Sequence, residues 1–347
     1  MKAYDYWLDE LSLKEHATQI NYLRYFHRYL EARGWTPEEL YERQRVVLMD
    51  GDPRSNREIV LDLSRYIRDM VKEGYASGTA VKAGHAVVSF MAANGLDFPL
   101  RAGDLPRVVM SGSRVALVDE IRELLDLMGG DRNRHRNRAL IMVSKDTGFR
   151  DGDVRRLDLA HVEGARVVEN GGVYRVFKPY VTEKTGELAY PYWGPEAEEA
   201  VQLYLETRGD AAGPLFQTEQ GTRMAHGSIG SMIIRKRNRL GWKKISHHSF
   251  RKFHRTALEA RMPESWVKKL QGKATDPYVQ PEHTGELTTS YVENYDALRV
   301  YGEKHELQRR LDELEDEQLK ASGMRSEMQT MREDIALLRR ALRQLEK

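Results

Sequence analysis

The segment His248-Ser249-Phe250-Arg251-Lys252-Phe253, followed at short distance by Leu270-Gln271-Gly272-Lys273, decides how this chain is interpreted. His248 and Arg251 are three positions apart, which puts both on one face of a helix. An arginine can hold two non-bridging phosphate oxygens at once and does not lose its proton. A histidine or a lysine can give a proton to a leaving oxygen. The stretch therefore predicts a helix that carries chemistry on a phosphate group.

Three further positions extend this set toward cleavage of a phosphodiester. Arg150 ends Thr147-Gly148-Phe149-Arg150, a turn that opens a helix, and a helix N-terminus favours phosphate. Lys184 stands at a predicted β-turn, with Lys178 as a nearby alternative. Tyr278 offers a hydroxyl that can attack phosphorus and hold the phosphate covalently. The predicted catalytic residues are Arg150, Lys184, His248, Arg251, Lys273 and Tyr278, with Asp153 as the carboxylate that orients Arg150.

This set, in this order, resembles the tyrosine recombinase (phage integrase) family over residues 4–301. The most specific match is His248-x-x-Arg251 followed by Leu270-Gln271-Gly272-Lys273. Thr147-Gly148-Phe149-Arg150 resembles the first arginine box of the family, and Thr182-Glu183-Lys184-Thr185 resembles its β-hairpin lysine. The Leu-Gln-Gly-Lys form is similar to archaeal and mobile-element integrases, and its lysine stands where most members carry histidine or arginine.

The resemblance implies a site-specific DNA recombinase or integrase that cleaves and rejoins DNA through a 3′-phosphotyrosine. Its partner would be double-stranded DNA, and no cofactor or metal ion is implied. Two duplexes need four active sites, so the implied working form is a homotetramer on DNA. Two other functions fit the same residues. One is a topoisomerase IB-like or telomere-resolving strand transferase, and the other is a non-catalytic DNA-binding assembly factor that kept the fold.

The nucleophile is the position for which the sequence offers alternatives. Tyr278 lies five residues after Lys273 and Tyr291 lies eighteen residues after it. The setting of Tyr278 resembles archaeal-type members, which also place a tyrosine on the following helix, as Tyr291 stands here. Tyr291 fits the apolar stripe of that helix, which favours core packing. Tyr278 is therefore the predicted nucleophile, Tyr291 is the alternative and Tyr295 is a third candidate.

The distribution of charge is more informative than its total. The 347 residues have a formal net charge of only +2, which by itself does not indicate a nucleic-acid partner. Local basic clusters are the pattern expected for a surface that binds DNA backbones. One cluster comprises Arg132, Arg134, Arg136 and Arg138. The predicted DNA-binding residues form another, centred on the candidate groove helix at 228–240, and they are Arg235, Lys236, Arg237, Arg239, Lys243 and Lys244.

Composition excludes several other kinds of site. The chain has no cysteine, so disulfides, thiolate metal sites and a cysteine nucleophile are excluded. No metal site is predicted. No apolar run approaches the roughly 20 residues needed to span a bilayer, and no signal peptide is visible. These observations predict a cytoplasmic, nucleoid-associated protein with no membrane partner.

The spacing of apolar residues predicts a mainly α fold with a small antiparallel β-sheet, an α+β arrangement in several domains. Residues 1–100 are predicted to form a helical domain that clamps DNA. Residues 101–114 are predicted to be a linker because they are rich in Gly, Pro and Arg. Residues 115–302 are predicted to form the catalytic domain. Heptads in 303–347 predict a C-terminal coiled coil whose partner is another protomer, or a helix that lies on its own domain.

Within these domains the pattern predicts specific elements. Residues 4–33 read as one helix that ends at Gly34. Residues 166–177 and 180–192 alternate in polarity around glycine turns and are predicted to form the sheet. Helices are predicted to resume after the sheet and to end with 287–301.

Overall fold

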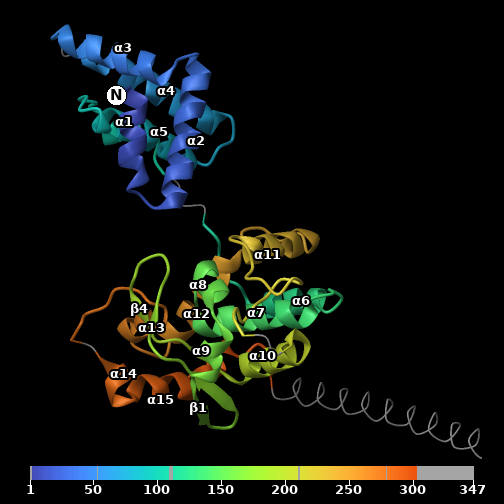
Figure 1. The fold of residues 1–347 in the computed structure, drawn as a ribbon. Coiled ribbons are helices and arrows are strands. Elements are labelled where there is room, and N and C mark those ends of the chain that lie inside the picture. Colours follow the sequence, from blue (N-terminus) through green and yellow to red (C-terminus); the bar gives the residue numbers. More distant parts are fainter. Residues whose placement is uncertain (1, 53, 109–111, 210–211, 279, 303–347) are drawn as a thin grey trace, which may run out of the picture. The chain divides into compact units, whose positions relative to one another are not determined.

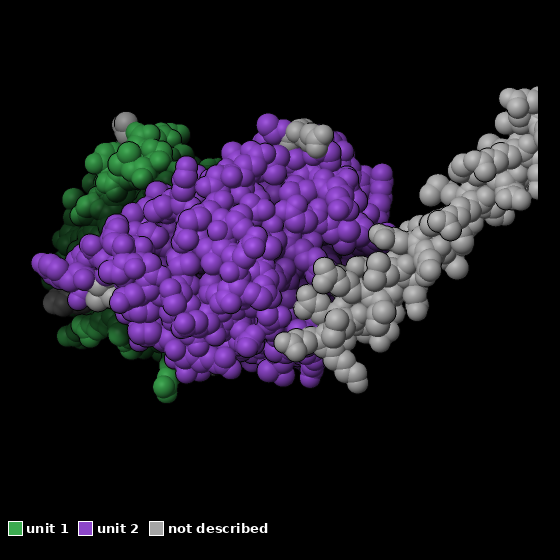
Figure 2. Space-filling model, turned by 90° about the horizontal axis from the view of Figure 1, so that it is seen from below, with its two compact units in different colours: residues 1–112 green, residues 113–347 purple. Residues whose placement is uncertain are grey.

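The computed structural model of the chain describes residues 2–52, 54–108, 112–209, 212–278 and 280–302. The chain divides into two compact units, Met1–Gly112 and Ser113–Lys347, which are coloured separately in Figure 2. We call them the N-terminal unit and the C-terminal unit and describe each by itself. The coiled coil predicted for residues 303–347 lies outside the described residues.

The N-terminal unit is helical and is built around a cluster of aromatic rings. The rings of Trp7, Phe26 and Phe90 lie in its core, with centroids 4.6 Å (Trp7 to Phe26) and 4.7 Å (Phe26 to Phe90) apart. Such rings bury large apolar areas and join three segments that are distant in sequence. The elements of this unit are α1 (Ala3–Ser12), α2 (His16–Arg33), α3 (Pro37–Met49), η1 (Ser55–Arg57), α4 (Glu58–Lys72), α5 (Ser77–Ala93) and η2 (Ala102–Asp104).

The single helix predicted for residues 4–33 is wrong, because the chain breaks between α1 and α2. The side-chain amide of Gln19 donates hydrogen bonds to the carbonyl oxygens of Ser12 (3.1 Å) and Lys14 (2.7 Å). These bonds satisfy carbonyl groups that a helix end leaves free. Leu13, at the break itself, is 87% exposed and adds nothing to the apolar face of either helix.

Part of the segment predicted to be a linker belongs to the N-terminal unit. Residues 102–104 form η2, and the Asp104 carboxylate accepts a charge-assisted hydrogen bond from Arg57 at 2.7 Å. Leu105 packs against the apolar core of the unit. The boundary between the two units follows Gly112.

The C-terminal unit is organised around helix α7 (Arg134–Thr147). This helix packs against α6, α10, α12 and strand β5, and its residues from Ala139 to Thr147 are all buried (Figure 1). A helix covered on every side can hold buried groups in fixed positions. The other helices are α6 (Val118–Met128), α8 (Asp151–Arg156), α9 (Leu159–Glu163), α10 (Pro195–Arg208), α11 (Ser228–Arg239), α12 (His247–Glu259), α13 (Glu264–Leu270), α14 (Pro281–Thr284), α15 (Glu286–Glu293) and η3 (Tyr295–Leu298).

The β-structure is antiparallel as predicted, but it forms two small sheets rather than one. The three-stranded sheet has the order β1-β2-β5, and β1 pairs with β2 in a register that sets Val167 opposite Arg175. The two-stranded sheet is the hairpin β3-β4, in which Tyr180 pairs with Ala189. The predicted mainly α fold class with a small antiparallel β-structure is confirmed. The strands are β1 (Arg166–Glu169), β2 (Val173–Val176), β3 (Tyr180–Val181), β4 (Leu188–Ala189) and β5 (Tyr192–Trp193).

Among the described residues, no helix combines the length and the apolar character needed to cross a membrane.

Candidate active site

The site begins where α7 ends, at a glycine that no other residue can replace without strain. Gly148 has a φ of +60°, a conformation that favours glycine. A Cβ atom placed there would lie 2.7 Å from the side-chain nitrogen of Gln271 and 2.8 Å from Nδ1 of His254. The Thr-Gly-Phe-Arg turn is thus packed directly against α12 and the Leu-Gln-Gly-Lys segment, although the three are far apart in sequence.

Arg251 is fixed in place by this packing. It projects from α12, is only 3% exposed, and donates hydrogen bonds to the backbone oxygens of Gly148 (2.7 Å) and Gln271 (3.0 Å). A guanidinium has five N–H donors, so three remain for a ligand. Burial, together with the nearby positive charge of Arg150, lowers the pKa of Arg251 to about 10. Burying a positive charge costs free energy, and an anion bound in the site would lower that cost by compensating the charge of Arg251.

Gln271 is a member of the site that sequence reasoning missed. Its side chain is fully buried, and its Nε2 donates to the backbone oxygen of Arg251 at 3.0 Å and lies 3.0 Å from Nδ1 of His254. Since the Gln271 backbone oxygen accepts from Arg251, the two residues hold each other from both sides. Gln271 is therefore a positioning residue for Arg251. Its place inside Leu270-Gln271-Gly272-Lys273 was the only signal in the sequence.

Arg150 stands beside Arg251 with an unused donor. It is the N-cap residue of α8, is partly buried, and its Nη1 is buried with no hydrogen-bond partner among the described residues. Asp153 is 1% exposed, and its carboxylate accepts the backbone N–H of Glu183 at 2.8 Å. Burial raises the pKa of Asp153, against the lowering effects of the Glu183 amide and of Arg150. Asp153 thus connects the β3-β4 hairpin to the turn Thr147-Gly148-Phe149-Arg150, which we call the arginine turn.

The two adjacent histidines of α12 have opposite environments, as their helical positions predict. His247 is buried, and its Nε2 lies 3.0 Å from the Ser144 hydroxyl. His248 keeps an exposed side chain. Partial burial and then the cations Lys252 and Arg251 lower the pKa of His248, and Lys273 and Arg150 contribute further. His248 therefore lies in the same positive field as the other candidate residues.

Lys273 lies beside the arginines, and the segment before it packs against the hairpin turn that carries Lys184. Partial burial, followed by the charges of Arg255 and Arg251, lowers the pKa of Lys273 to about 8. Gly272, just before it, has a φ of +60°, and a Cβ there would collide with the methyl group of Thr182 at the start of the hairpin turn. Lys184 lies in that turn and is exposed.

The three candidate tyrosines differ sharply in exposure. Tyr278 is 93% exposed in the segment between α13 and α14, so its ring is not packed against the other candidate residues. Tyr291 is fully buried, stacks on Tyr192 with centroids 5.1 Å apart, and donates a hydrogen bond to the backbone oxygen of Asp146 at 3.1 Å. The Tyr295 hydroxyl donates to the Asp146 carboxylate at 3.0 Å. Tyr291 and Tyr295 are both part of the core.

These buried tyrosines belong to an ionic cluster beneath the arginine turn. The ammonium of Lys145 is fully buried between the carboxylates of Asp146 (2.5 Å) and Glu196 (2.9 Å). Glu196 in turn accepts the backbone N–H groups of Val300 (3.0 Å) and Tyr301 (2.6 Å). Because the charges are paired and hydrogen-bonded, the cluster can lie inside the unit, and it ties the end of α7 to the last described residues.

The basic residues around α11 divide into exposed and structural members. The Lys236 side chain is 9% exposed, and its ammonium pairs with Asp131 and donates to the backbone oxygen of Leu127. Arg237 is partly buried and donates to the Ile245 backbone oxygen at 2.5 Å. We therefore leave Lys236 out of the proposed DNA surface, since burial and pairing occupy its charge. The exposed members are Arg235, Arg239, Lys243 and Lys244.

No group of three or more His, Asp or Glu side chains within the described ranges is arranged to hold a metal ion.

The buried histidines predict loss of stability in acid. Burial first, and then neighbouring positive charge, lowers the pKa of His247 to about 4 and that of His254 to about 3. In the unfolded chain a histidine has a pKa of about 6.5, so the unfolded state binds more protons below that pH. The free energy of unfolding should therefore be fully present above about pH 6.5 and fall below it, by roughly 3 kcal/mol per histidine at pH 4. Urea unfolding at pH 7, 5.5 and 4.5 measures this.

A variant isolates this effect from that of the carboxylates. His247→Gln should weaken the pH dependence by about one proton, whereas the same change at the exposed His283 should leave it unaltered. Equal pH dependence in both variants would show that His247 does not stay neutral in the fold.

Comparison with known proteins supports the fold. No protein-family model matches the sequence, and no curated protein matches it. The lambda integrase tetramer bound to a Holliday junction is 15% identical, with a TM-score of 0.56, over 79% of this chain and 74% of that chain. XerA recombinase is 20% identical, with a TM-score of 0.36, over 86% of this chain and 99% of that chain. XerH recombinase bound to palindromic difH, in a post-cleavage complex, is 17% identical, with a TM-score of 0.47, over 69% of this chain and 68% of that chain.

The XerA and XerH scores are below 0.5, so the fold is assigned from the lambda integrase. The similarity to the lambda integrase extends over more than three quarters of this chain. Because the identity is only 15%, the similarity is evidence for the fold alone. The predicted resemblance is confirmed at that level: this chain has the fold of the lambda integrase.

Proposed function

We propose that the chain is a DNA strand transferase of the tyrosine recombinase type that recombines specific DNA sites. The observation that carries the proposal is a pair of guanidiniums, that of Arg150, which is partly buried, and that of Arg251, which is buried. Both lie beside His248 and Lys273 and keep N–H donors for a ligand. Uncompensated positive charge of this kind suits a phosphate whose negative charge grows as phosphorus is attacked.

Each residue then has a role in a balanced exchange. The Tyr278 oxygen forms a bond to phosphorus, the bond from phosphorus to the 5′ oxygen breaks, and a 3′-phosphotyrosine results. The phenolic proton leaves to solvent or a nearby base, and Lys273 or Lys184 gives a proton to the departing 5′ oxygen. A 5′ hydroxyl from another strand reverses the steps, so the phosphodiester bond is restored without a nucleotide cofactor.

For this chain we propose double-stranded DNA as the partner and a tetramer as the working form. The lambda integrase to which it is similar is a tetramer bound to a Holliday junction. The exposed basic residues at the end of α11, Arg235 and Arg239 with Lys243 and Lys244, are the proposed contacts to the DNA backbone.

A covalent trapping experiment tests the proposal. A set of overlapping nicked duplexes that covers the DNA around the gene is incubated with the protein in excess chelator. Cleavage near the nick releases a short fragment that carries the 5′ hydroxyl. Without that hydroxyl the strand cannot be rejoined, so the covalent adduct persists. The expected product is a denaturant-resistant protein–DNA adduct. Its absence on every duplex, with DNA binding intact, would favour a non-catalytic assembly factor. Exchange between two intact duplexes, as opposed to relaxation or end closure, separates a recombinase from the related strand transferases.

The lowered pKa of Lys273 predicts a pH dependence of cleavage. If Lys273 is the proton donor, its ammonium form is required, and that form is lost as pH rises through about 8. The single-turnover cleavage rate should therefore fall above about pH 8. Lys273→Arg should lower the cleavage rate and remove this decline, because arginine neither gives up a proton to the departing oxygen nor titrates in that range. Lys184→Arg is the matched control and should leave the decline near pH 8. A decline at pH 8 in both variants would assign the titration to another group.

A further inference from the structure

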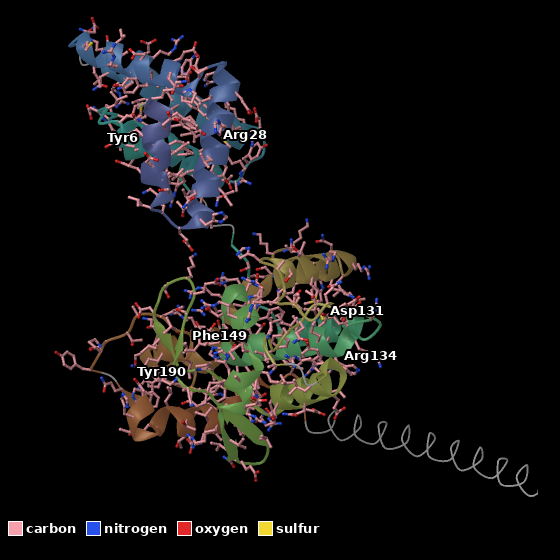
Figure 3. The ribbon with its side chains drawn as sticks, in the orientation of Figure 1. Tyr6, Arg28, Asp131, Arg134, Phe149 and Tyr190 are labelled. Carbon is pink, nitrogen blue, oxygen red and sulfur yellow. The ribbon has the colours of Figure 1, made fainter. Side chains whose placement is uncertain are left out.

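A basic cleft lies at the opposite end of α7 from the arginine turn. Two adjoining cavities of about 580 Å³ and 520 Å³ meet there and share Arg132, Asn133, Arg136 and Thr218 in their walls. In Figure 3, Asp131 and Arg134 lie together at the end of the C-terminal unit opposite Tyr190. A helix of 14 residues is about 21 Å long, so the cleft is roughly 20 Å from Gly148 and is not part of the candidate active site.

The cleft carries more positive charge than its own carboxylates compensate. Among the described residues that line it, seven are Arg or Lys and two are Asp or Glu. Both carboxylates are already paired, Glu219 with Arg132 at 3.0 Å and Asp131 with Lys236. Removing these two pairs leaves five cations with no carboxylate partner among the described residues. They are Arg134, Arg136, Arg208, Arg235 and Arg239.

Two details indicate that an anion is the missing partner. Arg136 donates to the Gln217 backbone oxygen at 2.7 Å, while its Nε is buried and has no partner within the described residues. The cleft also surrounds the N-terminus of α7, where Asn133 makes no side-chain capping bond. A helix N-terminus and guanidiniums favour the same ligand, a phosphate group.

We propose that this cleft is a second phosphate-binding site, separate from the strand-transfer centre. Its ligand is a phosphate group, supplied by the backbone of duplex DNA or by a free nucleotide or oligophosphate. The second cavity includes Arg235 and Arg239, so the cleft is continuous with the exposed basic end of α11. The site does not depend on strand cleavage, and its test does not require cleavage.

Two histidines allow the two sites to be observed separately. His135 lines the cleft, and its pKa is lowered by partial burial and then by Arg134 and Arg138. His248 lies in the candidate active site. Sodium tripolyphosphate is titrated into the full chain while the ring resonances of both histidines are followed by NMR. A saturable shift of His135 is expected, because an anion in the cleft changes the field at its ring.

The variant for this test replaces two exposed arginines of the cleft, Arg132→Gln with Arg134→Gln. It should weaken the tripolyphosphate affinity read at His135 by tenfold or more and leave the response of His248 unchanged. Arg261→Gln is the matched control, because Arg261 is exposed on the same unit and does not line the cleft. A His135 resonance that does not move, or that responds equally in the double variant, overturns the proposal.

The source of the phosphate is decided with duplex DNA. If DNA supplies it, the double variant should bind a 40-bp duplex more weakly, and the slope of log Kd against log salt should fall by about one for each DNA phosphate that the variant no longer binds. If the duplex affinity and its salt slope are unchanged while tripolyphosphate binding is abolished, the ligand is a free phosphate compound. Both results uphold a phosphate site in the cleft.

Discussion

Arg251→Ala is expected to reduce DNA strand cleavage by roughly 10²- to 10³-fold or more, which is the loss typical of removing one donor to a charge that develops in a transition state. Arg251 is suited to that role because its buried guanidinium is held by two backbone oxygens and keeps three donors free. DNA affinity should change little, since the proposed contacts to the DNA backbone lie at the end of α11. Single-turnover cleavage of a nicked duplex and a binding isotherm measure the two quantities.

The same bonds require a control for folding. Without Arg251, the oxygens of Gly148 and Gln271 lose their partners, which costs about 1–3 kcal/mol for each buried group. Arg150→Ala leaves fewer groups without a partner, because Nη1 of Arg150 makes no hydrogen bond to the described residues. It should show the same loss of cleavage with an unchanged melting temperature. Full cleavage by either well-folded variant would end the assignment of that arginine.

Tyr278→Phe is expected to bind DNA normally and to form no covalent adduct, because it removes the attacking oxygen and nothing that holds the fold. At 93% exposure, the Tyr278 ring contributes little to packing. A gel that separates covalent from dissociable complexes reads the result. Peptide mapping of the wild-type adduct should place the DNA on residues 274–281.

Tyr291→Phe is the matched comparison and should still form the adduct. Its hydroxyl is buried and bonded to the Asp146 backbone oxygen, so the change should cost about 1 kcal/mol of stability. Burial and the nearby Asp146 also raise the pKa of Tyr291, which disfavours the phenolate. An adduct on residues 288–299, together with an active Tyr278→Phe, would move the nucleophile to Tyr291.

The features that could be predicted from sequence are those that local geometry dictates. Glycine at Gly148 marks a positive φ after α7, and the three-residue spacing of His248 and Arg251 follows from the pitch of a helix. The same pitch separates His247 from His248 and predicts that only one of them is exposed. Alternating polarity and glycine turns predicted the antiparallel strands. Each of these predictions depends only on a few residues that are neighbours in the sequence.

The division of the β-structure and the break in the first helix needed more information. The strands pair as β1-β2-β5 and β3-β4, so β5 joins β2 and not its neighbour in sequence, β4. The break between α1 and α2 depends on Gln19, whose side chain reaches back to two carbonyl oxygens across the turn. An apolar spacing pattern contains neither fact.

The sequence by itself therefore determined the fold class and the candidate site residues other than Gln271, whose role depends on its buried contacts. Only the tertiary structure decided which of them are held, buried or free. Arg251 bonds to Gly148 across 103 positions and Tyr291 bonds to Asp146 across 145, while Lys236 pairs with Asp131 across 105. The burial and the hydrogen-bond partners of a side chain depend on residues that are distant in sequence and that the fold brings close. The local spacing of residues contains no information about these contacts.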